Sequence, residues 1–243
     1  MPAIRFGLAV VTYLAFFATF LYLIAFVGGV FVPKTVDSGT APATAVALVV
    51  NLALILLFGL QHSVMARPGF KAVLTRSIHP SIERTAYVFA TLVALWILFA
   101  YWQPMPRVIW QAEAEWAVMA LWALFLIGWT IAFISTWLLN HFELFGLQQT
   151  WLHMTGREAV LQKFRQPLFY KVSRHPLYLG MMIGIWAIPT MTLGHLVFAA
   201  GMTVYVLIAI RYEERDLITF LGDQYAEYRK RVGMLVPGIG KAK

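Results

Sequence analysis

Long apolar blocks, almost free of charged residues, alternate with short polar segments along most of the chain. Four of these blocks predict membrane-spanning helices, because about 20 apolar residues are needed to cross the hydrocarbon core of a bilayer. They cover residues 8–31, 44–65, 85–102 and 116–139. A fifth block, residues 177–210, is interrupted by Pro189 and by Gly194-His195 and predicts a helical hairpin. We therefore expect an all-α fold: a polytopic membrane helix bundle with four long spans, a C-terminal helical hairpin and a cytoplasmic tail helix.

Composition agrees with this pattern. Of the 243 residues, 60% are hydrophobic and only 12% are charged, and the mean hydropathy is +0.73, which excludes an ordinary soluble domain. The first span is too long, and lacks the small-residue cleavage site, for a removable signal peptide. There are no internal repeats or low-complexity linkers, so we expect one integral-membrane domain over residues 1–243. It has six crossings if both arms of the hairpin span fully.

The distribution of basic residues predicts the orientation. With the N-terminus inside, all but two of the 19 lysines and arginines (Lys34 and Arg107) fall on the cytoplasmic side. Both termini are then cytoplasmic, and a bacterial inner membrane is the expected location. The net charge of +8 reflects this topology and attraction to anionic lipid headgroups rather than nucleic acid. The run Arg229-Lys230-Arg231 is expected to be a solvated tail facing those headgroups.

Two residue types limit the possible chemistry. The absence of cysteine excludes disulfides, thiol catalysis and thiolate metal sites. The six histidines lack zinc-like spacing, so no metal is expected.

The motif Arg174-His175-Pro176-Leu177-Tyr178-Leu179-Gly180 stands at the start of the hairpin. His175 precedes a proline and is biased towards an extended conformation, while Pro176 suits the first position of a helix. Such a helix start offers free N–H groups and a positive dipole end beside Arg174, which suits a carboxylate or phosphate. Gly180 would let a ligand or a neighbouring helix approach closely.

A second polar cluster, Glu213-Glu214-Arg215-Asp216, follows the hairpin. Because one apolar hairpin separates the two clusters, we expect them to meet on one side of the membrane. Together they suit a charged, ribose-bearing cofactor, with Glu213 or Glu214 accepting the ribose hydroxyl hydrogens. The alternative is structural: Arg174 and His175 anchor a helix end, and the acids pair along their own helix.

Three further polar clusters end or open the apolar spans, and all are predicted on the cytoplasmic side. They are Gln61-His62-Ser63 with Arg67, Glu83-Arg84 with Tyr87, and the segment from Asn140-His141 to Gln148-Gln149. Polar groups at membrane depth are costly and normally face a cavity or one another. Interfacial hydrogen bonding and helix capping are the plainer interpretations of these residues.

The C-terminal motifs, continued by Gly222-x-x-Tyr225-x-x-Tyr228 and Val232-x-x-Leu235-x-Pro237, resemble the isoprenylcysteine carboxyl methyltransferase superfamily. Those membrane enzymes bind S-adenosylmethionine with this hairpin. Leu221 departs from the pattern, which usually has an aromatic residue or histidine there. With the N-terminal clusters, nearly the whole chain looks like the methanethiol S-methyltransferases, close kin of the NnrU-type membrane proteins.

This resemblance implies methyl transfer from S-adenosylmethionine to methanethiol, giving dimethyl sulfide, with no obligatory protein partner. A small alkanethiol has a pKa above the cysteine value of about 8.5, so a base is useful. The expected roles are as follows: His62 or His141 as base, with Arg84 or Arg67 as electrostatic support; Arg174, His175, Pro176, Tyr178, Gly180, Glu213 and Glu214 for the cofactor; and Ser63, Tyr87, Asn140 and Gln148 for the thiol.

Two other functions remain open. One is methylation of a larger acceptor, an isoprenylcysteine carboxylate or a phospholipid amine, which would need a tunnel open to lipid. The other is a non-catalytic haem-binding or transport protein of nitrogen-oxide metabolism. Haem would require histidines that face each other at matched depth, for which His62 and His141 are the candidates.

Overall fold

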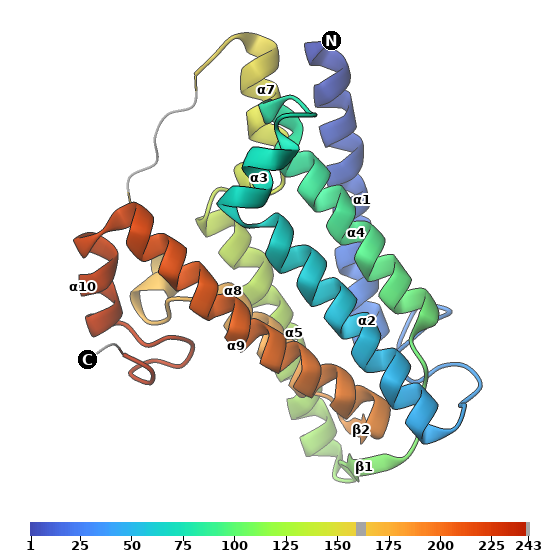
Figure 1. Cartoon of the computed structure of the whole chain (residues 1–243). Helices are drawn as coiled ribbons and strands as arrows, with labels where there is room; N and C mark the ends of the chain where they lie inside the picture. The colour runs from blue at the N-terminus through green and yellow to red at the C-terminus, as the bar shows by residue number, and fades with distance from the viewer. Residues whose placement is uncertain (159–163, 242–243) are drawn as a thin grey trace. The chain divides into compact units, whose positions relative to one another are not determined.

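The computed structural model describes residues 1–158 and 164–241 and is built almost wholly of helices (Figure 1). Lys163 and Lys243, counted above among the cytoplasmic basic residues, lie outside the described residues. The elements in chain order are α1 (Pro2–Gly28), α2 (Thr44–Met65), α3 (Pro68–Leu74), the 3-10 turn η1 (Pro80–Ile82), α4 (Glu83–Tyr101), β1 (Val108–Gln111), α5 (Glu115–Leu138), α6 (His141–Leu144), α7 (Leu147–Thr155), η2 (Leu168–Lys171), α8 (Pro176–Trp186), β2 (Thr190–Thr192), α9 (Leu193–Leu221) and α10 (Asp223–Arg231).

Five helices in the described part of the chain are long and apolar enough to cross a bilayer: α1, α2, α4 with its leading η1 turn, α5 and α9. The chain is therefore an integral membrane protein with an all-α core, and the four long spans are confirmed. The first is displaced towards the N-terminus, from residues 8–31 to Pro2–Gly28. It ends early because Gly29 is left-handed (φ 70°) and its N–H caps the Ala25 carbonyl.

The hairpin has one long arm and one short arm. α8 has 11 residues, so it is about 16 Å long, roughly half of the ~30 Å hydrocarbon core. α9 has 29 residues and continues as a helix well beyond residue 210. Between them, β2 pairs with β1 in a two-stranded sheet that the sequence did not predict. The condition for six crossings is not met, because the first arm is too short to span.

The chain divides into two compact units, each assembled from segments distant in sequence. Unit one contains Met1–Trp110, Asn140–Val160 and Met191–Phe198. Unit two contains Gln111–Leu139, Leu161–Thr190 and Ala199–Lys243. The expectation of a single domain over residues 1–243 stays a prediction.

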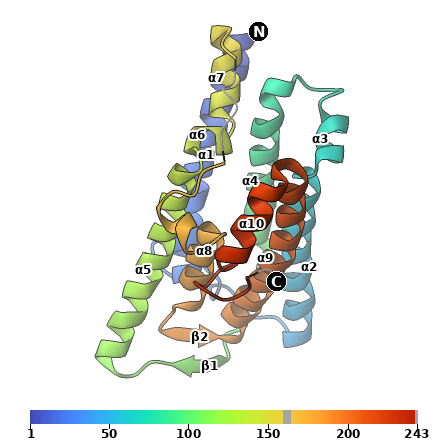
Figure 2. The same ribbon diagram turned by 90° about the vertical axis from the view of Figure 1, so that its left-hand side faces the viewer.

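Unit one is held together by aromatic packing among its long helices. α4 packs against α1 and α2, and α7 packs against α1; α2 and α4 run side by side in Figures 1 and 2. Phe26 of α1 lies 5.0 Å from Phe99 of α4 between ring centroids, and Trp102 lies 5.5 Å from Phe198. A second cluster, nearer the polar residues, buries Tyr87 among apolar neighbours.

Unit two depends on a close crossing of α5 and α8 (Figure 2). Three glycines, Gly128, Gly180 and Gly184, allow the two backbones to meet. A Cβ atom added to Gly180 would lie 2.5 Å from both the Ala132 nitrogen and the Gly128 oxygen. Small residues at a helix crossing are a common device in membranes, where van der Waals contact drives association. The structure thus shows Gly180 in contact with a neighbouring helix, one of the two roles expected for it.

Gly180→Ala is expected to lower the free energy of unfolding by about 1–3 kcal/mol, because the added methyl group overpacks a backbone contact. Gly7→Ala is the matched control, since a Cβ there would meet no atom of another segment within 4 Å and alanine favours the helix. Thermal unfolding in detergent checks both variants. Equal melting temperatures for Gly180→Ala and Gly7→Ala would contradict the account of this crossing.

Candidate functional site

Glu214 of α9 is buried at the centre of a charged cluster in unit two. Its Oε1 accepts hydrogen bonds from Arg174 Nε at 2.6 Å and from His175 Nε2 at 3.2 Å. Its Oε2 lies 3.0 Å from Arg229 Nε, an ion pair without hydrogen-bond alignment. The Arg174-His175 motif and the acids therefore meet, as the hairpin pattern predicted. Arg229 was expected in a solvated tail, and that was wrong because its guanidinium compensates a buried carboxylate.

Arg174 also ties the C-terminal tail to the start of α8. Its NH1 donates to the carbonyls of Arg229 (3.3 Å) and Val232 (2.5 Å), and its NH2 donates to that of Gly240 (3.1 Å). With the bond to Glu214, four of the five guanidinium N–H groups are used. The backbone N–H of Arg174 donates to Gly233 as well. Arg174 thus has little capacity left for a ligand carboxylate.

Glu213 differs sharply from its neighbour. Its side chain is 42% exposed, against 8% for Glu214. Glu213 Oε2 accepts a hydrogen bond from the Tyr178 hydroxyl at 3.0 Å, and His175 Nδ1 lies 3.9 Å away. Of the two acids, Glu213 is the one whose carboxylate can still accept hydrogen bonds from a ligand.

The start of α8 has the predicted form. His175 precedes the helix with φ −128° and ψ 61°, and buried Pro176 occupies its first turn. The first backbone bond runs from Leu179 N–H to the His175 carbonyl at 3.0 Å. The N–H groups of Leu177 and Tyr178 consequently have no partner within the helix, as at any helix start.

His62 of α2 forms a defined hydrogen-bond chain within unit one. The Tyr87 hydroxyl lies 2.7 Å from His62 Nε2, and His62 Nδ1 lies 3.1 Å from Thr91 Oγ1. Thr91 Oγ1 donates its hydrogen to the Tyr87 carbonyl at 2.9 Å, so it accepts from the histidine. This assigns a neutral imidazole with its hydrogen on Nδ1 and its Nε2 lone pair directed at the Tyr87 hydroxyl.

The two candidate arginines of unit one have different surroundings. The Arg84 guanidinium carbon lies 4.8 Å from the Tyr87 ring centroid, and Arg84 Nε donates to the Leu144 carbonyl at 2.6 Å. Arg67 Nε instead donates to the Ser63 carbonyl at 3.2 Å, at the end of α2. Arg84 is therefore in direct contact with Tyr87, a member of the hydrogen-bond chain that contains His62.

His141, also in unit one, is 2% exposed and lies among aromatic rings. Its Nε2 is 2.9 Å from the Tyr13 hydroxyl, and its ring centroid is 5.0 Å from that of Phe145. Burial lowers its pKa below the ordinary histidine value. With His62 Nε2 bonded to Tyr87, the Nε2 atoms of both histidines already face a tyrosine hydroxyl, which does not suit axial haem ligation.

Asn140 is the residue immediately before α6 and has a left-handed backbone conformation (φ 79°). Its Nδ2 donates to Gln148 Oε1 at 2.6 Å and to Glu143 Oε2 at 2.9 Å. These mutual bonds order the connection between α6 and α7. The thiol-binding role expected for Asn140, Gln148 and Ser63 stays a prediction.

Comparison with known proteins places the chain in a family. Residues 50–237 match the family described as NnrU protein. The chain belongs to the NnrU family. All the site residues expected from the sequence fall within the range that matches NnrU. Tyr13, which contacts His141, precedes that range.

Several relatives of this NnrU-family chain carry functional names. It is 48% identical to methanethiol S-methyltransferase 1 of Bradyrhizobium diazoefficiens over 96% of this chain and 82% of that protein. It is 50% identical to the methanethiol S-methyltransferase of Mycobacterium tuberculosis over 93% of each chain. The nurim protein of Sus scrofa is 32% identical over 71% of this chain and 68% of that protein. No solved structure matches the chain.

Four residues of the clusters were not predicted as site residues from the sequence of this NnrU-family protein. They are Tyr13, Thr91, Tyr225 and Arg229. Thr91 had a usable signal, since it lies one helical turn after Tyr87. Tyr225, whose hydroxyl is 3.5 Å from Glu214 Oε1, belongs to the quoted C-terminal pattern. Tyr13 lies in an apolar span with no local sign of its partner.

The stability of this NnrU-family protein should depend on pH through His141. Because its pKa is lowered on folding, the unfolded chain binds a proton more readily once the pH falls below about 6.5. The folded state therefore loses stability on acidification, and above that pH the contribution is complete. The melting-temperature advantage of the wild type over His141→Asn should shrink from pH 7.5 to pH 5.5, measured in detergent.

Phe99→Leu provides the control for this titration, because it changes a buried aromatic residue that packs against Phe26 rather than His141 and removes no titratable group. Its melting-temperature difference from the wild type should stay constant over the same range. A wild-type advantage over His141→Asn that is constant or grows on acidification would contradict the assignment of a neutral, buried His141.

Proposed function

We propose that this chain methylates methanethiol with S-adenosylmethionine as donor, giving dimethyl sulfide and S-adenosylhomocysteine. The observation that carries the proposal is its 48–50% identity, over nearly all its length, to two proteins named methanethiol S-methyltransferase. The polar clusters of both units suit the two tasks of such an enzyme, cofactor binding and activation of a thiol. We also propose a bacterial inner membrane with both termini cytoplasmic, on the strength of the basic residues.

The polar groups of unit two suit the binding of S-adenosylmethionine, and Glu213 and Glu214 would have different roles in it. Glu213, exposed and fixed by Tyr178, would accept hydrogens from the ribose hydroxyls or the amino group. The N–H groups at the start of α8 would receive a carboxylate or a ring nitrogen. Glu214, Arg174 and His175 would hold this surface in shape, because their charges are already matched to one another.

When bound, S-adenosylmethionine supplies a methyl group on a positively charged sulfur. For methyl transfer, a side chain must remove the thiol proton as the new carbon–sulfur bond forms. We assign this to Tyr87 and His62: the Tyr87 oxygen takes the thiol proton while its own hydrogen passes to His62 Nε2. Thr91 keeps the other ring nitrogen protonated, and the Arg84 cation beside the Tyr87 ring favours negative charge on the tyrosine and the thiol.

This assignment ranks His62 above His141 as the base. His62 is half-buried and bonded to a hydroxyl that can relay a proton. His141 is enclosed by aromatic rings, and its bond to Tyr13 is best explained as a structural contact. Arg67, which lies between α2 and α3 and donates to the Ser63 carbonyl, has no assigned part in proton removal.

Methanethiol-dependent release of S-adenosylhomocysteine by the purified protein tests the proposal. S-adenosylmethionine should be consumed only when the thiol is present. Release that depends instead on an added phospholipid or a prenylated cysteine would replace methanethiol by a larger acceptor. A Soret absorbance band in the purified protein, without turnover, would favour the haem-binding function.

A further inference from the structure

Unit two carries a second polar site, in a pocket between α9 and α10. The pocket has a volume of about 280 Å³ and is lined by Arg211, Glu214, Arg215, Ile218, Thr219 and Arg229. Three of these six residues are arginines. This composition points to an anionic ligand rather than to the thiol or to the sulfonium cofactor.

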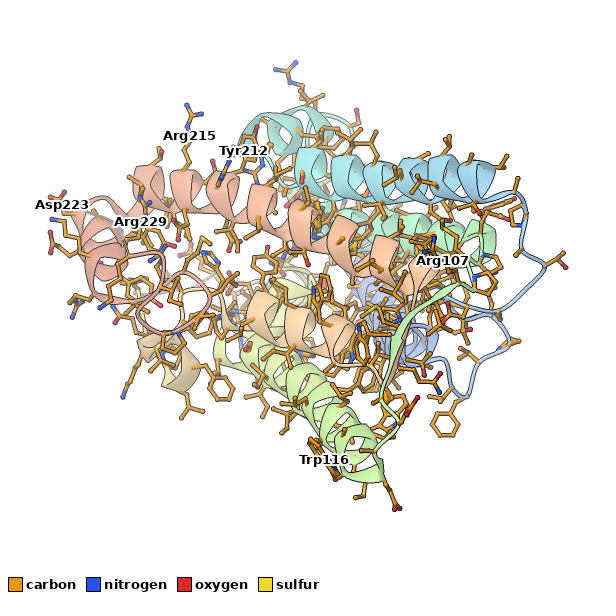
Figure 3. All side chains as sticks on the ribbon, turned by 90° about the horizontal axis from the view of Figure 1, so that it is seen from below. Arg107, Trp116, Tyr212, Arg215, Asp223 and Arg229 are labelled. Atoms are coloured by element: carbon orange, nitrogen blue, oxygen red, sulfur yellow. The ribbon has the colours of Figure 1, made fainter. Side chains whose placement is uncertain are left out.

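The pocket opens on a different side of α9 from the proposed cofactor residues. Arg211 and Arg215 are one helical turn apart and share a face. Glu213 is two residues beyond Arg211, so it projects about 200° round the helix, where it contacts Tyr178. In Figure 3, Arg215 projects away from α9 on the side of Tyr212. A ligand in this pocket would therefore not compete with a ligand held by Glu213.

The charges of the pocket are unbalanced. Glu214 supplies the carboxylate among the lining residues, and this carboxylate already contacts the side chains of Arg174, His175 and Arg229. Arg211 and Arg215 are exposed, and neither forms an ion pair with a carboxylate in residues 1–158 and 164–241. The guanidinium groups of Arg211 and Arg215 therefore give the pocket a net positive charge, because the charges of Glu214 and Arg229 compensate each other. Lys230 and Arg231, which follow Arg229 on α10, are also exposed.

The position of the pocket along α9 identifies the source of the anion. From Leu193 to Ile210 the helix has no aspartate, glutamate, lysine or arginine, and Arg211 is its first arginine. The arginines thus lie where the apolar segment ends, at the level of the lipid headgroups. Tyr212, 52% exposed beside them, is typical of that interface. The planar guanidinium binds phosphate oxygens in pairs, and basic pockets at this level bind anionic headgroups.

We propose that the pocket formed by Arg211, Arg215 and Arg229 binds the phosphate of an anionic phospholipid of the surrounding membrane. Arg211 and Arg215 supply the free donors, and Arg229 links the headgroup to buried Glu214. A bound lipid would thereby fasten α10 and the C-terminal tail to the spanning helix α9.

The test uses the full chain in a zwitterionic detergent and short-chain dioctanoyl phosphatidylglycerol as probe, with affinity measured by calorimetry. Arg211→Gln/Arg215→Gln should weaken this affinity by about tenfold or more, because two charge-assisted contacts are lost. Arg76→Gln/Arg231→Gln is the control: it removes the same charge from two exposed arginines outside the pocket. Unchanged melting temperatures establish that both double variants are folded.

Three results would overturn the proposal. Equal weakening in both double variants would indicate general attraction between a basic surface and anionic lipid. Equal binding of dioctanoyl phosphatidylcholine would show that the net charge of the headgroup is not recognised. Tighter binding of inorganic phosphate than of phosphatidylglycerol, lost in Arg211→Gln/Arg215→Gln, would assign the pocket to free phosphate. Selective loss of phosphatidylglycerol in that variant, with weak inorganic phosphate binding, supports the lipid site.

Discussion

Glu214→Gln is expected to lower the free energy of unfolding by about 3 kcal/mol or more, because it leaves buried Arg174 without its countercharge. Arg174 and Glu214 are both almost fully buried, and Arg174 also holds three carbonyls of the tail. Loss of the carboxylate should therefore loosen the tail as well as the cluster. Thermal or denaturant unfolding in detergent measures the effect.

Glu213→Gln is the matched variant, one residue away and with the opposite expected result. Its side chain is 42% exposed, so its melting temperature should stay near that of the wild type. Its affinity for S-adenosylmethionine, measured by calorimetry, should fall because one charge-assisted contact is lost. A stable Glu214→Gln protein beside an unstable Glu213→Gln protein would contradict the division of roles between these acids.

His62→Gln is expected to reduce turnover of methanethiol by about 10²–10⁴-fold, the usual contribution of a general base. Tyr87→Phe should cause a loss in the same range, because it removes the hydroxyl that connects the thiol to His62. Both substitutions should reduce turnover more than the affinity for S-adenosylmethionine, since neither residue is among those proposed to hold the cofactor. His141→Gln should leave most of the turnover intact.

A purely structural role for these residues can be separated from proton removal by changing the thiol. An acidic thiol that is already ionised at neutral pH needs no base, so the losses in His62→Gln and Tyr87→Phe should largely disappear with it. Equal losses with methanethiol and with the acidic thiol would contradict the proton-transfer role. Wild-type turnover in His62→Gln would transfer the role to another residue.

The long spans could be predicted from sequence because each is a continuous apolar run of sufficient length. The end of α8 agrees with the interruption at Pro189, which follows soon after the start of the block at residue 177, but the strand β2 within that interruption could not be predicted from the apolar pattern. The pairing of β1 with β2 depends on contacts between segments far apart in the chain. Such contacts leave no local periodicity.

The roles of single residues in the candidate site also depend on contacts between distant segments, and they could not be predicted from the sequence pattern. The pattern indicated that Arg174 and the acids would meet, but it could not distinguish Glu213 from Glu214. That difference depends on how α9 is rotated about its axis against α8 and α10. Arg229 belongs to a basic run that resembles an exposed tail, yet α10 turns it towards Glu214 while Lys230 and Arg231 remain exposed.

Headspace gas chromatography of the purified protein, given methanethiol and S-adenosylmethionine with a deuterated methyl group, would show whether the protein transfers that methyl group to the thiol. We expect dimethyl sulfide carrying one labelled methyl group, formed in equal amount to S-adenosylhomocysteine and strongly reduced in His62→Gln. The absence of labelled dimethyl sulfide, from a protein that binds S-adenosylmethionine and unfolds cooperatively, would contradict the proposed function.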